Sequence, residues 1–258
     1  MRLMKRILSA AAVLALSASL LVGCSSGTAS SVPVSASSAA ESTVSSVEET
    51  ASSAVDENEA AAAQLLNDLT GSYQELWPVI LADEYKQTWL DDCTALVGED
   101  NAEAAFEKLS SMVTGDVYGE DAVEAYANGG GAYFCGFTNS LATLTFDGET
   151  STISGTDKDG NVLFSHTYHY IGMEPVRGLY EFQSDDADSG EFTYFFLAPD
   201  TSAETYHIEF RYGSDAEALS QYDAGEYAYW LASGISTDCD QTMIDNCIEL
   251  FCTENLAG

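Results

Sequence analysis

Histidine is the scarcest side chain in this sequence that could bind a metal ion or transfer protons, and it occurs only at His166, His169 and His207. All three lie in segments whose alternating pattern predicts β-strands. Since successive side chains on a strand point to opposite faces, His166 and His169 cannot bind one ion together.

A second pattern places an imidazole and a carboxylate on the same strand face. In residues 205–211, alternation puts His207, Glu209 and Arg211 on one face and an apolar set on the other. His207 and Glu209 together are a plausible ligand pair for zinc or a similar ion. The same spacing also fits an ordinary polar face on which Glu209 contacts Arg211 or a neighbouring strand.

Motifs for catalysis are missing from the sequence. There is no G-x-S-x-G elbow, no Walker A motif, no G-x-G-x-x-G after a strand and no H-E-x-x-H. The acidic clusters at 157–159 and 185–191 do not have EF-hand spacing and are interpreted as solvated turns. We therefore predict no catalytic residue and no enzyme activity.

The number and spacing of the cysteines indicate which of them could form disulfides. Apart from Cys24, the chain has Cys93, Cys135, Cys239, Cys247 and Cys252, an odd set without a C-x-x-C pair. At least one thiol is therefore expected to be free or intermolecular, and buried unpaired cysteine is the alternative to disulfides. Cys247 and Cys252, five apart on an expected helix, should point to different sides.

The charge and composition of the chain limit the classes of molecule that it can bind. The 258 residues hold 42 Asp and Glu against 8 Lys and Arg, a formal net charge of −34. Binding to nucleic acid is excluded because few basic groups could neutralise phosphates. The acidity favours cations as ligands, and the 11% of aromatic residues are enough for a packed core.

The N-terminus is expected to target and anchor the protein. A basic start and the apolar run 7–22 are typical of a signal peptide, and the run ends in Leu-Val-Gly followed by Cys24. This resembles a bacterial lipobox and predicts a signal peptide over 1–23, lipidation of Cys24, and a protein held at the extracytoplasmic face of the bacterial cytoplasmic membrane. Residues 24–63, rich in Ser, Ala and Glu, are predicted to be a disordered tether.

The remaining residues predict helices followed by a sheet. The helical part of the domain is expected over 64–127. Helical spacing is found in the segments 60–69, 101–113 and 121–126. Short alternating runs lie within 132–213, and Asp-Gly turns join some of them. This pattern favours an antiparallel barrel or sandwich. Helices are expected again in 214–258. The fold class is therefore mainly β with helices (α+β).

A family resemblance rests mainly on residues 176–236. The runs V-R-G-L-Y-E-F, L-A-P, A-E-T-Y-H-I-E-F, Y-G-S-D-A-E-A-L and Y-W-L-A-S-G-I-S resemble the ZinT family of exported zinc-binding proteins. Upstream, G-S-Y-Q-E-L-W-P at 71–78 and Y-H-Y-I-G at 168–172 match that family's first helix and a strand. The resemblance covers about 69–256 and implies a calycin-like (lipocalin-like) antiparallel β-barrel with helices before it and a closing C-terminal helix.

The resemblance also implies a metal site. The family binds zinc with three histidines, two from an H-F-H strand and one from an S-D-H stretch. Here the first motif corresponds to Thr205-Tyr206-His207, and the second corresponds to 193–196, which has no histidine. Only His207 carries over, so Glu209, Glu204, His166 or a free cysteine would have to complete the set. His207, Glu209 and His166 are the predicted metal ligands.

These features together predict a tethered lipoprotein that binds a divalent metal, with zinc as the expected ion, for scavenging or for delivery to a metal ABC importer. The alternative is a metal-free calycin-like module that binds an apolar ligand or a protein partner. Disulfide pairing, oligomeric state and the identity of any small-molecule ligand do not follow from the sequence.

Overall fold

The computed structural model describes residues 57–257. The signal peptide, Cys24 and most of the predicted tether lie outside the described residues. Within residues 57–257, no helix has both the length and the apolar character needed to cross a membrane.

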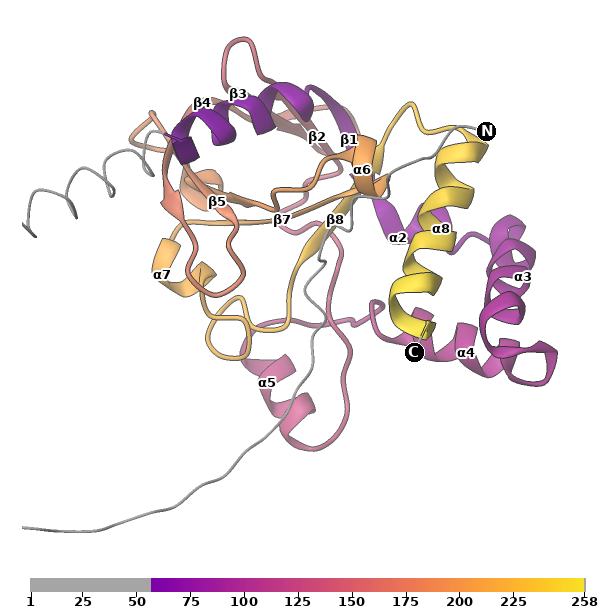
Figure 1. Cartoon of the computed structure of the whole chain (residues 1–258). Helices are drawn as coiled ribbons and strands as arrows, with labels where there is room; N and C mark the ends of the chain where they lie inside the picture. Colours follow the sequence, from indigo (N-terminus) through magenta and orange to yellow (C-terminus); the bar gives the residue numbers. More distant parts are fainter. Residues whose placement is uncertain (1–56, 258) are drawn as a thin grey trace, which may run out of the picture. The chain divides into compact units, whose positions relative to one another are not determined.

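A closed antiparallel barrel forms the centre of the fold, and its strands follow one another around the barrel until the first pairs with the last (Figure 1). The strands are β1 (Gly71–Glu75), β2 (Thr143–Asp147), β3 (Thr152–Thr156), β4 (Val162–Met173), β5 (Tyr180–Ser184), β6 (Tyr194–Leu197), β7 (Ile208–Gly213) and β8 (Ala232–Ser236). This confirms the predicted fold class. Closure leaves no unpaired strand edge along the sheet.

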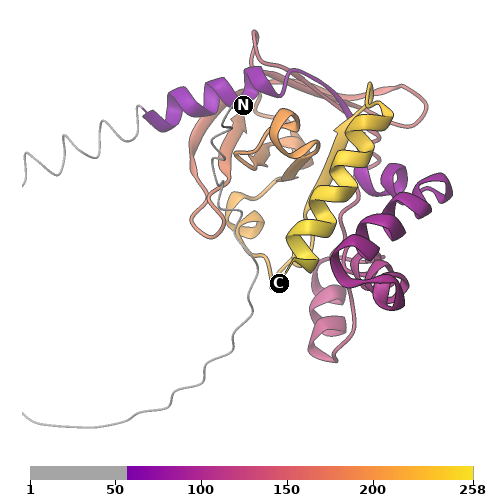
Figure 2. The same cartoon turned by 45° about the vertical axis from the view of Figure 1, so that its right-hand side comes forward.

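Helices precede, interrupt and close the barrel. The helical segments are residues 57–68, α2 (Leu76–Ile80), η1 (Asp83–Tyr85), α3 (Lys86–Val97), α4 (Glu99–Ser111), α5 (Glu120–Ala127), η2 (Gly190–Phe192), α6 (Ser202–Thr205), α7 (Ala216–Leu219) and α8 (Gln241–Leu256). The helix over 57–68 lies across one end of the barrel, and α8 lies beside β8 and α3 (Figures 1 and 2).

Three predicted boundaries differ from the structure. The strands β1 and β8 lie outside the range 132–213 expected for the barrel. β1 was expected to be part of a helix, whereas only 76–80 of that segment are helical. β8 is made of small residues buried on both faces, so it does not have the alternation that marks the other strands. The helix over 57–68 also begins inside the range expected to be tether.

Aromatic side chains fill the barrel. The barrel core includes Phe146, Phe182, Phe195, Phe210 and Trp230, none more than 1% exposed. Burying a side chain of this size contributes about 1.5–3 kcal/mol. The interior is therefore a packed core, to which the helix over 57–68 adds leucines at one end.

A second apolar cluster, here called the helical core, lies between the outside of the barrel and the helices. Its members come from α2, α3, α4, β8 and α8, and Trp89 and Ile248 at its centre have no exposed surface. The indole N–H of Trp89 donates to the Ile80 carbonyl at 2.7 Å, which ties α3 to α2. The helical core holds α8 against the barrel, and the candidate site lies at this contact.

Candidate metal centre

His207 is positioned by a short helix and a left-handed residue. Thr201 and Glu204 form a capping box that starts α6, and Tyr206 then turns the chain with φ of 65°. β7 begins directly after His207. The alternation over residues 205–211 predicted extended backbone from residue 205, and this start was wrong because the capping box favours a helical turn there.

The predicted alternation along β7 is confirmed. Ile208, Phe210 and Tyr212 belong to the barrel core, whereas His207 and Glu209 line a cavity on the outside of the barrel. Their side chains are 19% and 44% exposed. The two predicted ligands therefore share the face that α8 covers.

The geometry around the imidazole leaves one nitrogen facing the carboxylate. His207 Nδ1–H donates to the Thr205 carbonyl at 2.7 Å, and Nε2 lies 3.9 Å from Glu209 Oε1. A hydrogen bond from one ring nitrogen to a backbone carbonyl is the usual way to orient a metal-binding imidazole. The separation of 3.9 Å is too long for a hydrogen bond, and two ligands of a tetrahedral zinc site lie about 3.4 Å apart.

Further potential ligands surround this pair. Cys247 on α8 places its Sγ 3.8 Å from His207 Nδ1. The cavity has a volume of about 80 Å³ and is lined by Leu76, Trp77, Ile80, His207, Glu209, Cys247, Leu250, Phe251 and Glu254. Its walls are thus α2, β7 and α8, with Glu254 as a second carboxylate.

Electrostatics couple these groups. Desolvation lowers the pKa of His207, but its interactions with Cys247 and with the charge of Glu209 outweigh this effect and hold the pKa well above its ordinary value. Burial raises the pKa of Glu209, and the interaction with His207 more than reverses this, so the net direction is down. Burial raises the pKa of Glu254, and the nearby carboxylates of Glu209 and Asp200 raise it further. A cation bound here would relieve this repulsion.

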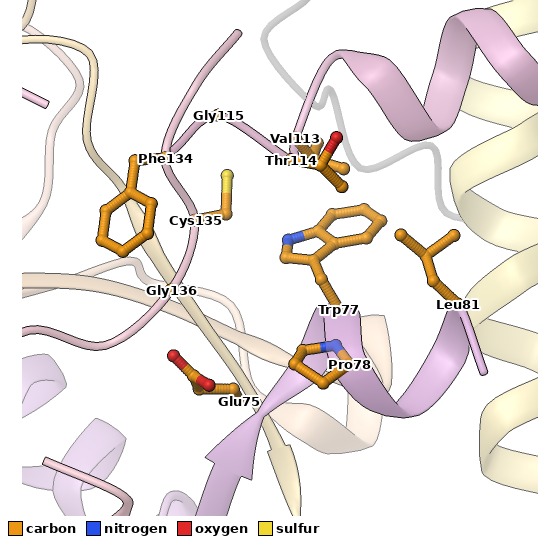
Figure 3. Close-up of a pocket in the computed structure, with 10 residues that line it drawn as sticks. All are labelled: Glu75, Trp77, Pro78, Leu81, Val113, Thr114, Gly115, Phe134, Cys135 and Gly136. Carbon is orange, nitrogen blue, oxygen red and sulfur yellow. The ribbon is translucent and has the colours of Figure 1, made fainter. Parts of the chain in front are cut away.

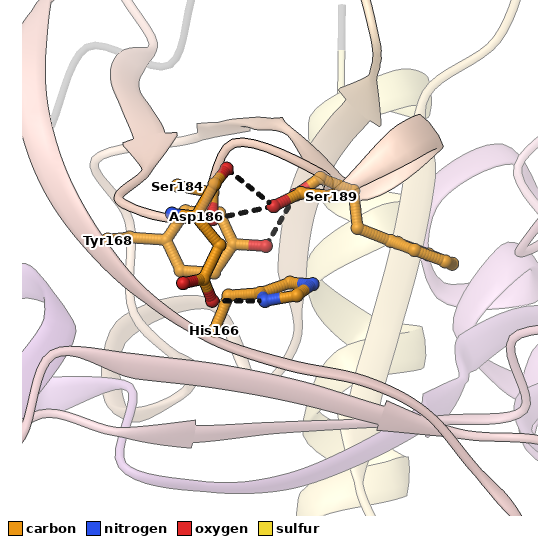
Figure 4. Close-up of polar contacts among 6 residues, drawn as sticks. His166, Tyr168, Ser184, Asp186 and Ser189 are labelled. Atoms are coloured by element: carbon orange, nitrogen blue, oxygen red, sulfur yellow. Dashed lines mark hydrogen bonds and ion pairs between the residues drawn. The ribbon is translucent and has the colours of Figure 1, made fainter.

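His166, the third predicted ligand, lies in a different place. It is on β4 beside Phe164 and Tyr168, and its Nδ1–H donates to Asp186 Oδ2 at 2.7 Å (Figure 4). A hydrogen bond of 2.8 Å between Ser189 and Ser184 fixes the turn that carries Asp186. His166 does not line the cavity that holds His207 and Glu209, so the structure does not bring the three predicted ligands together.

The other histidine on β4 points to the opposite face, as predicted. His169 is 52% exposed, and its Nδ1 lies 2.6 Å from Asp185 Oδ1. Adjacent aspartates of one turn thus pair with the two histidines on either face of β4.

Two residues considered as neighbours or substitutes of His207 have other roles. Arg211 is fully buried, and its guanidinium donates to the carbonyls of Leu219, Gln221 and Tyr227 and packs on the Tyr222 ring. Glu204 accepts from Thr201 in the capping box. Arg211 therefore anchors the segment after β7, instead of the contact with Glu209 considered from the spacing.

No group of three or more His, Cys, Asp or Glu side chains within residues 57–257 is arranged to hold a metal ion as it stands. His207 and Glu209 form a two-ligand arrangement, with Cys247 and Glu254 at the edges of the same cavity. Neither of these α8 residues could be assigned to the site from the sequence, because α8 is more than thirty positions away in the chain and reaches β7 only through packing.

A larger cavity of about 320 Å³ lies on the other side of Trp77 (Figure 3). Its lining is mostly apolar and consists of Glu75, Trp77, Pro78, Leu81, Val113, Thr114, Gly115, Phe134, Cys135 and Gly136. Glu75 Oε1 accepts from the Phe137 N–H at 2.6 Å, and the buried Trp77 indole N–H has no acceptor among the described residues. This cavity could take an apolar ligand.

Comparisons with known proteins give similarity to two solved structures. The first is the Zn(II)-bound ZinT-like domain of Streptococcus pneumoniae AdcA, with 15% identity, a TM-score of 0.45, and coverage of 71% of this chain and 89% of that chain. The second is Zn(II)-bound AdcA from Streptococcus pneumoniae, with 14% identity, a TM-score of 0.42, and coverage of 70% of this chain and 34% of that chain. No family model matches the chain, and no curated protein matches it. The first of these is a ZinT-like domain by description. At this similarity, neither structure assigns a ligand or a residue to this chain.

Proposed function

We propose that this chain binds a divalent metal ion, zinc in the first place, through His207 Nε2 and a Glu209 carboxylate oxygen. The observation that carries the proposal is the distance of 3.9 Å between these two atoms, combined with the hydrogen bond that fixes the opposite ring nitrogen. The pair lies in a cavity whose nearby carboxylates favour a cation.

The third protein ligand in this proposal is Glu254. It lines the same cavity from the last turn of α8, and its pKa responds to both His207 and Glu209. Water would complete the coordination, because zinc sites with three protein ligands keep an open position. Such a site, with two carboxylates, is expected to bind more weakly than one built from three imidazoles and to accept other divalent ions.

The proposal includes a location and a role. The signal peptide and Cys24 predicted from the sequence would place the domain at the extracytoplasmic face of a bacterial cytoplasmic membrane. An accessible site of moderate affinity there would suit capture of zinc and transfer to a metal ABC importer. Transfer requires release, and a site with one imidazole and exposed carboxylates is suited to release.

Calorimetric titration with zinc tests the proposal on the wild-type chain and on His207→Ala. We expect one equivalent bound per chain in the wild type and no saturable binding in the variant. Because the pKa of His207 is raised, binding should also release a proton, so the measured enthalpy should vary with the ionisation enthalpy of the buffer. Equal binding by both proteins, or a wild type that does not bind, would reject this assignment.

His169→Ala is the matched control. This histidine is exposed, has a carboxylate partner and lies outside the cavity. The His169→Ala variant also loses one imidazole, but from outside the cavity, and its zinc affinity should equal that of the wild type.

A second candidate function is supported by the 320 Å³ cavity beside Trp77. In this alternative the domain binds an apolar ligand there, since the barrel interior is already filled by aromatic side chains. The neutral fluorescent probe N-phenyl-1-naphthylamine tests it. Saturable binding that is lost in Gly136→Leu and kept in His207→Ala would favour this function, because a side chain at Gly136 meets Glu75 and Phe134 within about 3 Å.

A further inference from the structure

Two cysteines from distant parts of the chain meet inside the helical core. Cys93 on α3 and Cys252 on α8 have their Sγ atoms 3.9 Å apart, although 159 positions separate them in the sequence. Neither residue has exposed surface. Contact between two buried thiols on packed helices is the arrangement from which a disulfide can form.

The other cysteines of the described chain have different surroundings. Cys247 lies beside His207, Cys135 lies 3.9 Å from the Tyr133 carbonyl, and Cys239 is half-buried before α8. Cys247 and Cys252 lie on the same helix, but Cys247 lies beside His207 whereas Cys252 lies beside Cys93. Cys93 is therefore the cysteine that Cys252 is placed to pair with.

We propose that Cys93 and Cys252 form a disulfide that joins α3 to α8. An S–S bond is about 2.05 Å long, so the two sulfur atoms must approach by roughly 2 Å through side-chain rotation and a small movement of the helices. No disulfide joins the five cysteines of the described chain in the present structure.

Formation of the bond needs an oxidant, and an oxidised disulfide, either glutathione disulfide or a thiol oxidoreductase, can supply it. One thiolate attacks a sulfur of the oxidant and displaces a thiol, which gives a mixed disulfide. The second thiolate then attacks the protein sulfur of the mixed disulfide and displaces the second thiol. The pair loses two electrons and two protons, and the oxidant is reduced to two thiols.

Burial determines when this exchange is fast. Desolvation raises the pKa of both Cys93 and Cys252, so few thiolates form once the helices have packed. Exchange should therefore be faster while the chain folds than in the folded dithiol protein. For the same reason, the finished bond should resist reduction until the helices separate.

Peptide mapping of the full-length chain tests the pairing. The protein is refolded with glutathione disulfide, alkylated without reduction, and cut after glutamate. Cleavage after Glu84 and Glu99 isolates Cys93, and cleavage after Glu249 and Glu254 isolates Cys252 from Cys247. We expect a cross-linked pair of peptides 85–99 and 250–254 that disappears on reduction. Free Cys93 and Cys252, or a link from Cys252 to another cysteine, would overturn the proposal.

Thermal unfolding gives an independent measurement that does not involve zinc. The bond closes a long loop, so the oxidised wild type should melt roughly 5–10 °C above the reduced protein. Cys93→Ala and Cys252→Ala should each lose this difference, whereas Cys239→Ala should keep it. Comparing the oxidised and reduced forms of each variant separates the bond from any effect of the substitution on packing. A difference that persists in Cys93→Ala would also overturn the proposal.

Discussion

Two histidine–carboxylate pairs of this molecule differ in the separation between the imidazole nitrogen and the carboxylate oxygen. On β4, His166 donates a short hydrogen bond to Asp186, whose side chain is 62% exposed. At the start of β7, His207 uses Nδ1 for a backbone carbonyl and leaves Nε2 facing Glu209 across 3.9 Å. The first pair is complete as a hydrogen bond, whereas the second leaves a separation close to that of two zinc ligands. Residue type alone does not distinguish them.

Removing the imidazole from each pair should give the largest difference. We expect His207→Ala to lower zinc affinity by at least about 100-fold, because loss of groups that only orient a ligand already costs roughly 10–100-fold. His166→Ala should change it less than about twofold, since His166 does not line the cavity. Competition with a zinc-sensitive dye measures both. Equal losses in the two variants would mean that the pairs are not functionally different.

The pH dependence of binding comes next in size. The raised pKa of His207 means that Nε2 keeps its proton to higher pH in the metal-free protein than the imidazole of an ordinary histidine does. Zinc must displace this proton, so affinity should fall by about tenfold for each pH unit below the folded pKa. Zinc should therefore bind more weakly at pH 5.5 than at pH 7.5, by up to about 100-fold. An affinity that is constant over this range would exclude His207 as a ligand.

Replacing the carboxylates is expected to have a smaller effect. Glu209→Gln keeps the shape but removes the charge, and we expect about a tenfold loss of zinc affinity. Asp186→Asn is the matched change in the β4 pair and should have no effect on zinc. If Glu209→Gln binds as the wild type does, the carboxylate is not a ligand and the third position must be reassigned.

Stability should show the smallest effect. The folded pKa of His207 is raised, so its contribution is complete below the unfolded value near 6.5 and declines as the pH rises through the folded pKa. The folded pKa of Glu209 is lowered, so its contribution is complete above the unfolded value near 4.5 and is lost at lower pH. The pair therefore stabilises the metal-free protein most between these values. Because Glu209 is 44% exposed, solvent screens the pair and the difference should be below about 1 kcal/mol.

Urea unfolding of the wild type and of Glu209→Gln at pH 5.5 and pH 9 measures this contribution. The difference between the two proteins should be larger at pH 5.5. A difference that grows with pH would contradict the proposed ion pair.

Much of the fold follows from local pattern. Alternation and Asp-Gly turns predicted strands in the range that holds β2 to β7, and helical spacing predicted α4 and α5 within a few residues. The predictions failed where local signals conflict with tertiary environment. β8 is buried on both faces, and β1 is a short strand that runs directly into α2. These two segments are strands because β1 pairs with β2, β8 pairs with β7, and the two pair with each other.

For the site, residue alternation alone predicts that His207 and Glu209 share a face, because side chains alternate on any extended backbone. It also determined that His166 and His169 cannot share an ion. Tertiary structure decided that His166 pairs with Asp186 away from His207, and that α8 brings Cys247 and Glu254 to the same cavity. It likewise brought Cys93 to Cys252. The physical reason is that alternation acts between neighbouring residues, whereas contacts between distant elements depend on how the barrel closes and which helices pack against its outer face.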